Sequence, residues 1–265
     1  MNISTASLSG QGGRVSNQDQ LGECIGKRSA CFVVCDGIAG MPGGDMAATL
    51  ACNAILSRFD GEKHLNAQHI REYVNQANQA VRTGQKSVQD YHRMGTTLVS
   101  LFIDRDYQLA YWVHAGDSRL YFFRRGRLCH VTTDHSLMQQ MKDAGYQTDG
   151  VNSNLLCFAL GMGNESREAS YSDVVPVEDG DVFLLCTDGF WHGVSEEQMK
   201  KSLHMVNSPD EWLTLMNQIL LKNGEQGEQD NYSAVAVWVG WTQDTTLLHT
   251  RADAAQFFPF GIKSE

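Results

Sequence analysis

The sequence lacks the features that would place the protein in a membrane or outside a cell. No run of apolar residues approaches the roughly 18–20 that a bilayer-spanning helix needs. The opening segment, MNISTASLSGQGGR, contains neither the basic nor the apolar part of a secretory signal. The seven cysteines are an odd number and include no C-x-x-C pair, which argues against a disulfide framework and structural zinc. We therefore expect a cytoplasmic protein.

Basic residues and prolines are also scarce. The 21 lysines and arginines face 31 acidic residues, so the formal charge is −10. A general binder of nucleic acid or anionic membranes would carry a basic face, so neither partner is expected, although a local basic pocket is compatible with this charge. With four prolines, no charge block and no repeat, the 265 residues show no interdomain linker. The hydrophobic share of 42% is typical of a globular protein.

The patterns that are present predict both strands and helices. Short apolar runs between turn residues predict strands at 30–35, 96–103, 107–114, 120–124, 182–187 and 233–239. Those within 96–132 are expected to form one antiparallel meander. Strands that pair with their neighbours, separated by pairs of helices, indicate an α+β fold in which helices cover stacked antiparallel sheets.

The helices are predicted from 3.6-residue spacing and from their caps. Apolar positions recur over 44–59 and 66–83. A third helix is expected to begin at the N-cap Asp134, with Leu137, Met138 and Met141 facing inward. A capping box at Ser195 and a proline at position 209 mark two further starts.

Several aspartates stand close to predicted strands. Asp36 and Asp188 end apolar runs, Asp230 precedes one, and Asp117 lies between two, while Asp19 lies in RVSNQD near the start. Each one alone is more easily explained as a turn former, because Asp-Gly pairs such as Asp36-Gly37 are common in turns. If several converge in one cleft, their mutual repulsion favours bound cations, and oxygen ligands select Mg²⁺ or Mn²⁺ over zinc. Two such ions can activate water for in-line attack on a phosphate ester.

Taken together and in order, these segments resemble the motifs of the PP2C-type (PPM) metal-dependent protein serine/threonine phosphatases, in their bacterial stand-alone branch. The resemblance spans about residues 10–240, and we expect a catalytic domain over 1–240 followed by an extension of unknown role over 241–265. The matching segments are RVSNQD from Arg14, VVCDGIAGMPGGDMAA around Asp36, MGTT from Met94, HAGDSRLYFFRRGRLCHVTTDHSL around Asp117, ALG from Ala159, LLCTDGFWHGVS around Asp188 and EQDN from Glu228.

The resemblance implies a four-layer αββα sandwich with a metal cleft at one edge. Asp36 would bridge two Mn²⁺ or Mg²⁺ ions, and Gly37 would add its carbonyl oxygen. Asp188 and Asp230 would complete this dinuclear site, and Asp19 would hold water beside it.

The same resemblance assigns the substrate phosphate to Arg14, whose guanidinium can hold two phosphate oxygens at once; the alternative is an ordinary surface arginine. Asp117, with Asp188, matches the positions of a third, weaker metal. Ile38 stands where eukaryotic members often carry a histidine proposed as a general acid, so that group is missing. Asn231 is expected to order the Asp230 loop.

The function implied is hydrolysis of phosphoserine and phosphothreonine in proteins, by a monomer opposed by a Ser/Thr protein kinase. Two alternatives remain open at this point. One is a catalytically silent scaffold of the same fold, although such members usually lose metal aspartates and none is lost here. The other is a narrow-target phosphatase of one bacterial signalling regulator.

Overall fold

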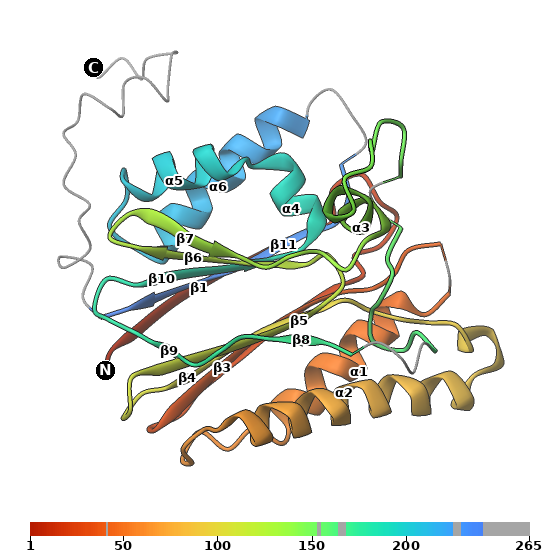
Figure 1. Cartoon of the computed structure of the whole chain (residues 1–265), viewed down its shortest axis with the longest axis horizontal. Coiled ribbons are helices and arrows are strands. Elements are labelled where there is room, and N and C mark those ends of the chain that lie inside the picture. The colour runs from red at the N-terminus through yellow and green to blue at the C-terminus, as the bar shows by residue number, and fades with distance from the viewer. Residues whose placement is uncertain (41, 153–154, 164–167, 225–228, 241–265) are drawn as a thin grey trace.

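The computed structural model describes residues 1–40, 42–152, 155–163, 168–224 and 229–240. In these residues two antiparallel sheets stack face to face and helices cover both outer faces, which gives four layers (Figure 1). This architecture confirms the predicted α+β class and the αββα sandwich.

The first sheet has five strands in the order β1-β11-β10-β6-β7. They are β1 (Ile3–Gly10), β6 (Arg119–Arg124), β7 (Arg127–Val131), β10 (Val182–Cys186) and β11 (Tyr232–Val239). The first and last strands pair along their whole length, with Gly10 opposite Tyr232. This pairing brings the segment that follows β1 close to the segment that precedes β11.

The second sheet has the order β2-β3-β4-β5-β8, with β9 also paired to β5. Its strands are β2 (Asp19–Ile25), β3 (Ser29–Asp36), β4 (Leu98–Asp104), β5 (Leu109–Ala115), β8 (Ser170–Tyr171) and β9 (Val175–Pro176). The register places Asp19 directly opposite Asp36. Two of the predicted metal-site aspartates are therefore neighbours across one strand pair.

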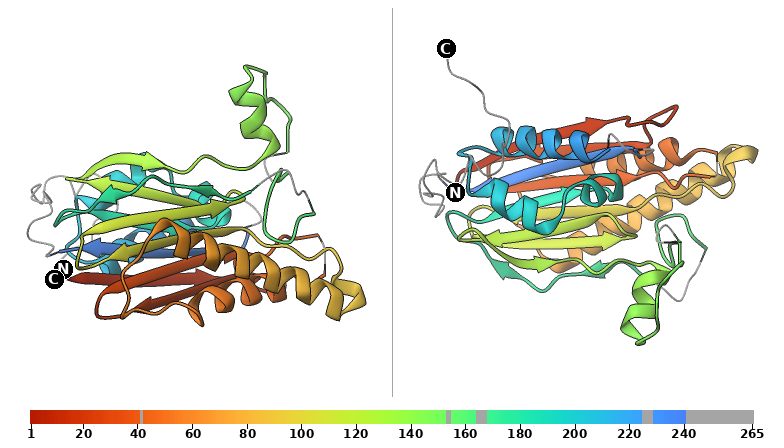
Figure 2. Two further views of the ribbon diagram at one scale, coloured as in Figure 1. Left: turned by 60° about the horizontal axis from the view of Figure 1, so that its bottom comes forward. Right: turned by 90° about the horizontal axis from the view of Figure 1, so that it is seen from above.

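Helices cover the sheets unequally. The second sheet is covered by α1 (Gly44–Leu56) and α2 (Ala67–Ser87), and the first by α4 (Asp188–Gly193), α5 (Glu196–Leu203) and α6 (Pro209–Gly224). A short 3₁₀ turn, η1 (Gln89–Tyr91), follows α2. The remaining helix, α3 (Leu137–Asp143), projects from the sandwich (Figure 2). No helix in the described ranges is long and apolar enough to span a membrane.

Alternation along β3 shows how one strand serves two cores. Phe32 and Val34 pack between the two sheets. Cys31 and Val33, which point to the other face, pack under α1 and α2. Because successive side chains of a strand point to opposite faces, a strand buried on both sides reads as a continuous apolar run. The buried cysteine acts here as a small hydrophobic residue.

The predicted single meander over 96–132 is wrong. β4 and β5 form a hairpin of the second sheet, whereas β6 and β7 belong to the first. The chain therefore crosses between the sheets at residues 116–118, where Gly116 has a φ of 101° that disfavours any side chain. The crossing segment carries Asp117.

The predicted start of the third helix is also wrong. Ser136 is the N-cap, since its hydroxyl accepts the backbone N–H of Gln139. Asp134 instead binds Arg119 through two hydrogen bonds of 2.8 Å. No residue of α3 is buried, and Leu137 is exposed rather than inward-facing. The capping box at Ser195 and the start of α6 at its proline are confirmed.

Candidate active site

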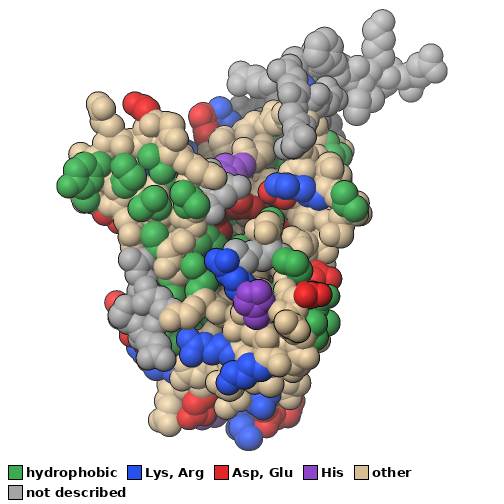
Figure 3. All heavy atoms as spheres, turned by 90° about the vertical axis from the view of Figure 1, so that its right-hand side faces the viewer, with side chains coloured by type: hydrophobic (Ala, Val, Ile, Leu, Met, Phe, Trp, Pro, Cys, Tyr) green, Lys and Arg blue, Asp and Glu red, His purple; other side chains and the backbone are tan. Residues whose placement is uncertain are grey.

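The predicted aspartates converge at one end of the sandwich, where strands of both sheets meet their loops. Viewed from this end, acidic side chains lie in a hollow between the upper and lower halves of the molecule (Figure 3). The hollow contains a cleft of about 100 Å³. It is lined by Arg14, Gln18, Asp36, Gly37, Ile38, Ala39, Thr97, Asp117, Leu156, Asp188, Asp230 and Asn231.

Asp36 ends β3, and the glycine after it is required by the packing. A Cβ atom on Gly37 would lie 2.3 Å from the backbone carbon of Gly44, at the start of α1. The backbone around Asp36 is held by Thr97, whose hydroxyl accepts the Asp36 N–H at 2.9 Å and whose own N–H donates to the Asp36 carbonyl at 2.8 Å. The carboxylate is thus presented from a fixed strand end.

Asp188 and Asp230 arrive from two adjacent strands of the first sheet. Asp188 is the first residue of α4, directly after β10, and Asp230 precedes β11. A Cβ atom on Gly189 would lie 2.1 Å from the Asn231 carbonyl oxygen, so only glycine permits this close approach. The two carboxylates therefore enter the cleft side by side.

Asp19 lies between the two sheets. Its Oδ2 accepts the Thr187 hydroxyl at 3.0 Å, and the Thr187 oxygen in turn accepts the Ser233 N–H at 2.9 Å. The other oxygen, Oδ1, is buried without a hydrogen-bond partner among the described residues. A buried carboxylate oxygen with an unused lone pair indicates space for a donor that the protein itself does not supply.

The segment that carries Asp117 is held at three consecutive residues. The Gly116 N–H donates to Nδ1 of His135 at 3.3 Å. The Trp191 indole N–H donates to the Asp117 carbonyl at 3.0 Å. The Ser118 hydroxyl lies 2.7 Å from that of Thr97. Each residue of the crossing is thus fixed by a different element, and Asp117 is directed into the cleft.

Thr97→Val is expected to weaken the fold, because the hydroxyl that it removes joins Asp36 to Ser118. The buried Asp36 N–H loses its acceptor, so the free energy of unfolding should fall by about 1–3 kcal/mol. Urea denaturation would measure this, with Thr97→Ser as the matched control that keeps the hydroxyl. Equal stability of the valine variant and the parent would contradict the assigned bonds.

The acidic side chains raise one another's pKa values. Burial, and after it the charges of Asp19, Asp188 and Asp117, raises the pKa of Asp36 well above its usual range. Burial and the charge of Asp230 raise that of Asp188. Without a counter-charge the folded protein therefore resists full ionisation of the cleft.

The pKa values of Asp117 and Asp19, at the sides of the cleft, are also raised. Burial and the charge of Asp188 raise the pKa of Asp117 to about 7. Burial raises the pKa of Asp19 to about 6, although the nearby hydroxyl groups of Ser233 and Thr187 act in the opposite direction. Oxygen donors that repel one another in a small cleft suit hard divalent cations. The donor types present therefore suit the predicted Mn²⁺ or Mg²⁺, while among the described residues no three such side chains already stand at metal-binding distances and Asp230 is bound to Arg14.

Arg14 is the one lysine or arginine among the described residues that line the cleft. Its Nε and Nη2 atoms donate to Oδ1 and Oδ2 of Asp230, each at 2.7 Å. Its loop is anchored by Asn231, whose amide donates to the carbonyls of Gln11 and Ser16 and accepts the Gln18 N–H. Asn231 thus ties the loop of Arg14 to the strand that follows Asp230.

Several residues that shape the cleft were not singled out from the sequence. Thr97, Trp191 and Thr187 are examples. Each forms a hydrogen bond with an aspartate, or with its neighbour, that is distant from it in the chain. All three lie inside segments quoted above, MGTT and LLCTDGFWHGVS. Their position inside a matching segment was therefore the one sign in the sequence that these residues belong to the site. Their hydrogen-bond partners could not be predicted, because those depend on the fold.

Comparison with known proteins agrees with this geometry. The family described as protein phosphatase 2C matches residues 11–229. The serine/threonine phosphatase Stp of Listeria welshimeri is 28% identical over 215 residues, which cover 77% of this chain and 82% of that protein.

Solved structures are similar as well. The serine/threonine phosphatase PstP/Ppp of Mycobacterium tuberculosis has a TM-score of 0.78 and 26% identity, covering 90% of this chain and 99% of that chain. A PstP catalytic domain in complex with two manganese ions has a TM-score of 0.76, also at 26% identity, and covers 90% and 98% of the two chains. With its family match over most of its length, the chain belongs to the protein phosphatase 2C family.

Proposed function

We propose that this chain, a protein serine/threonine phosphatase by family, uses two divalent ions held by Asp36, Gly37, Asp188 and Asp230. The observation that carries the proposal is the convergence of these three carboxylates in one cleft, where the pKa values of Asp36 and Asp188 are raised. When bound, Mn²⁺ or Mg²⁺ would neutralise the cleft and activate water for attack on a phosphate ester. The related PstP domain with two manganese ions supports the same stoichiometry.

The remaining carboxylates have supporting parts in this proposal. Asp19 would position water through its unpartnered Oδ1. Asp117, whose pKa is raised by burial and by the charge of Asp188, would share a third and weaker ion with that residue. Both assignments place oxygen ligands around a hard cation.

Arg14 would hold the substrate phosphate. Its guanidinium already binds a carboxylate through two parallel hydrogen bonds, and a phosphate presents the same pair of oxygens. When Asp230 turns to a metal ion, Arg14 would become available to the substrate. Its side chain is 48% exposed, so it can make this exchange at the mouth of the cleft.

Arg14→Ala is expected to lower kcat/KM for a phosphothreonine peptide by about 10- to 100-fold, because a charge-assisted bidentate contact is lost. Arg14→Lys should recover only part of this loss, since an ammonium group cannot form the same fork. Steady-state kinetics on both variants would measure it. An alanine variant with parental kcat/KM would favour the surface-arginine alternative.

The biological setting is proposed on the same basis. Phosphorylated serine and threonine residues of proteins would be the substrates, a Ser/Thr protein kinase would oppose the enzyme, and the protein would act as a cytoplasmic monomer. Residues 1–240 would form the catalytic domain. The predicted extension over 241–265 lies outside the described residues, and its role stays a prediction.

Hydrolysis of p-nitrophenyl phosphate and of a phosphothreonine peptide, with and without Mn²⁺, tests the proposal. We expect metal-dependent turnover of both substrates by the parent and none by Asp188→Asn. No hydrolysis at millimolar Mn²⁺ would instead favour the silent scaffold, and parental activity of Asp188→Asn would remove that residue from the site. A phosphoproteomic comparison of deletion and parent strains would distinguish a narrow target from a broad one.

A further inference from the structure

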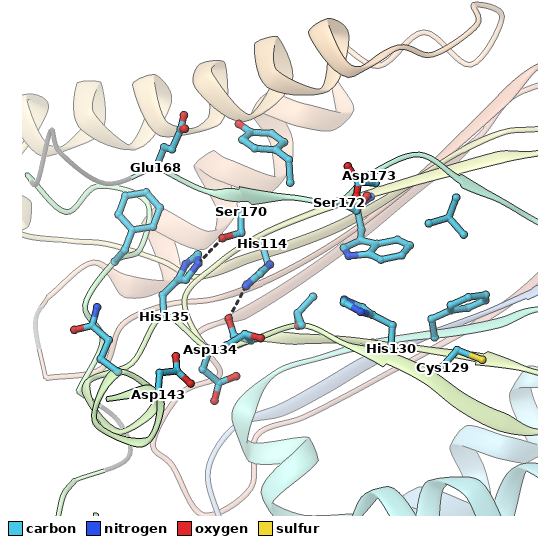
Figure 4. Close-up of a pocket in the computed structure, with 18 residues that line it drawn as sticks. His114, Cys129, His130, Asp134, His135, Asp143, Glu168, Ser170, Ser172 and Asp173 are labelled. Atoms are coloured by element: carbon cyan, nitrogen blue, oxygen red, sulfur yellow. Dashed lines mark hydrogen bonds between the residues drawn. The ribbon is translucent and has the colours of Figure 1, made fainter. Parts of the chain in front are cut away.

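A second and larger hollow lies beside the cleft, along the open edges of the two sheets (Figure 4). It has a volume of about 920 Å³. Its walls come from β5, from β6 and β7, from the segment between β7 and α3, from α3 and from the segment around β8. We call it the lateral groove, and the residues that characterise it are Trp112, Phe122, His130, Asp143, Tyr171 and Asp173.

The floor of the lateral groove is aromatic and uncharged. Trp112 and Phe122 are each only 6% exposed, and the His130 ring lies 5.0 Å from that of Trp112. Burial lowers the pKa of His130 and of His114, which also lines the groove. Burial thus favours the neutral form of both imidazoles, and the floor is aromatic without a lysine or arginine among its described residues.

The rim of the lateral groove is acidic, and no lysine or arginine is among its described lining residues. Four carboxylates line it: Asp134, Asp143, Glu168 and Asp173. Asp134 is neutralised by Arg119, and Glu168 lies 3.7 Å from Arg71 in an exposed ion pair. In the described part of the chain no basic side chain lies within ion-pair distance of Asp143 or Asp173. These two lie at different ends of the groove (Figure 4).

An arginine of the protein itself already uses one of these rings. The Arg71 guanidinium lies 4.2 Å from the centre of the Tyr171 ring and close to Glu168. A cation above an aromatic face, paired with a carboxylate, is a favourable arrangement for arginine. Further aromatic rings and carboxylates line the groove. This combination favours the binding of basic side chains and disfavours the binding of phosphate.

The lateral groove also adjoins the catalytic cleft. Leu156 lines the cleft and Phe158 lines the groove, so a single residue separates them along the chain. That residue, Cys157, donates its N–H to the His135 carbonyl at 2.7 Å. A polypeptide whose phosphorylated residue enters the cleft can therefore continue into the groove.

We propose that the lateral groove binds a segment of the phosphoprotein substrate that contains arginine or lysine and flanks the phosphorylated residue. This inference rests on the proposed phosphatase function. The rim carboxylates Asp143 and Asp173 bind the basic side chains, and the aromatic floor supports their aliphatic and guanidinium parts. The phosphate itself goes to the cleft, because the described lining of the groove contains four carboxylates and no lysine or arginine.

The test compares three phosphothreonine peptides that differ only in flanking residues, which are arginine, alanine or glutamate. The parent should favour the arginine peptide over the alanine peptide by about five- to tenfold in kcat/KM, through KM. In Asp143→Lys/Asp173→Lys this ratio should fall to about one. The matched control is Glu23→Lys/Glu62→Lys, which reverses two exposed charges near β2. This strand lies at the edge of the second sheet opposite to β8 and the groove, so the control should keep the parental ratio.

Hydrolysis of p-nitrophenyl phosphate, which does not reach the groove, should be equal in all three proteins. Equal kcat/KM for arginine and alanine peptides in the parent, or a preference that survives in Asp143→Lys/Asp173→Lys, would overturn the groove assignment. If no substrate were hydrolysed, the proposed function would fail instead. Fluorescence anisotropy of the unphosphorylated arginine peptide in EDTA would then test the groove assignment by itself. Weaker binding by Asp143→Lys/Asp173→Lys than by the parent would support the assignment, and equal binding would refute it.

Discussion

Asp36→Asn is expected to abolish phosphatase activity and at the same time to stabilise the metal-free protein. The carboxylate is proposed to help hold the two ions, and losing metal catalysis would cost several kcal/mol of transition-state stabilisation, or about three orders of magnitude in kcat. In the absence of metal, the same charge is buried among Asp19, Asp117 and Asp188. Asparagine has nearly the same shape and removes this repulsion.

Two measurements separate these effects. Mn²⁺-dependent turnover of a phosphothreonine peptide reports the first, and thermal unfolding in EDTA at pH 7.5 reports the second. Asp106→Asn is the matched control, because Asp106 is an exposed residue of the β4–β5 turn at the opposite end of the hairpin from the cleft. A metal-free Asp36→Asn protein that melts below the parent would show that the Asp36 charge is compensated within the protein.

Mn²⁺ is expected to raise the melting temperature of the parent, and by more at pH 7.5 than at pH 5.5. A ligand at 100 times its Kd stabilises the folded state by about 2.7 kcal/mol. For a domain of this size that corresponds to roughly 5–10 °C. The ions are expected to bind the folded state alone, because the aspartates proposed to hold them come together only through the two sheets.

The pH dependence follows from the direction of the pKa shifts. Asp19, Asp36, Asp117 and Asp188 bind protons more tightly in the folded protein than in the unfolded chain, where the ordinary pKa is 3.8, and the pKa of Asp117 reaches about 7. Between about pH 4 and pH 7 the folded state thus holds more protons, so these groups make the metal-free protein less stable as the pH rises. Protons compete with metal over the same range, which weakens Mn²⁺ binding at pH 5.5.

Differential scanning fluorimetry with and without Mn²⁺ at the two pH values would measure both effects. Asp106→Asn should show the parental shift, whereas Asp188→Asn should show a smaller one. An unchanged melting temperature with Mn²⁺, or a larger shift at pH 5.5 than at pH 7.5, would count against a carboxylate metal site in this cleft.

The strands that the sequence did not predict are those whose stability comes from their partners. β1, ISTASLSG, has no apolar run, yet it pairs along its whole length with β11. β2 contains Gly22, Glu23 and other weak strand formers, but β3 supplies its hydrogen bonds. Strand propensity depends strongly on such context. Together these two strands carry the ends of the Arg14 loop, so the position of that loop was not predictable either.

What the sequence determined by itself was local. The Ser195 capping box, the proline start of α6 and the buried strands β3, β10 and β11 depend on residues within one or two turns or on a continuous apolar run. The order of the aspartate-bearing segments was also sufficient to indicate the family. Their prediction needs no knowledge of long-range partners, because the signal lies in neighbouring residues.

Only the tertiary structure decided which groups meet. Asp134 pairs with Arg119 across 15 positions of the chain, and Arg14 pairs with Asp230 across 216. The chain also crosses from one sheet to the other at Asp117. Such contacts depend on strand order and register, and a register shift of one residue would turn every side chain to the other face. The acidic cleft and the lateral groove beside it are therefore properties of the packed sandwich.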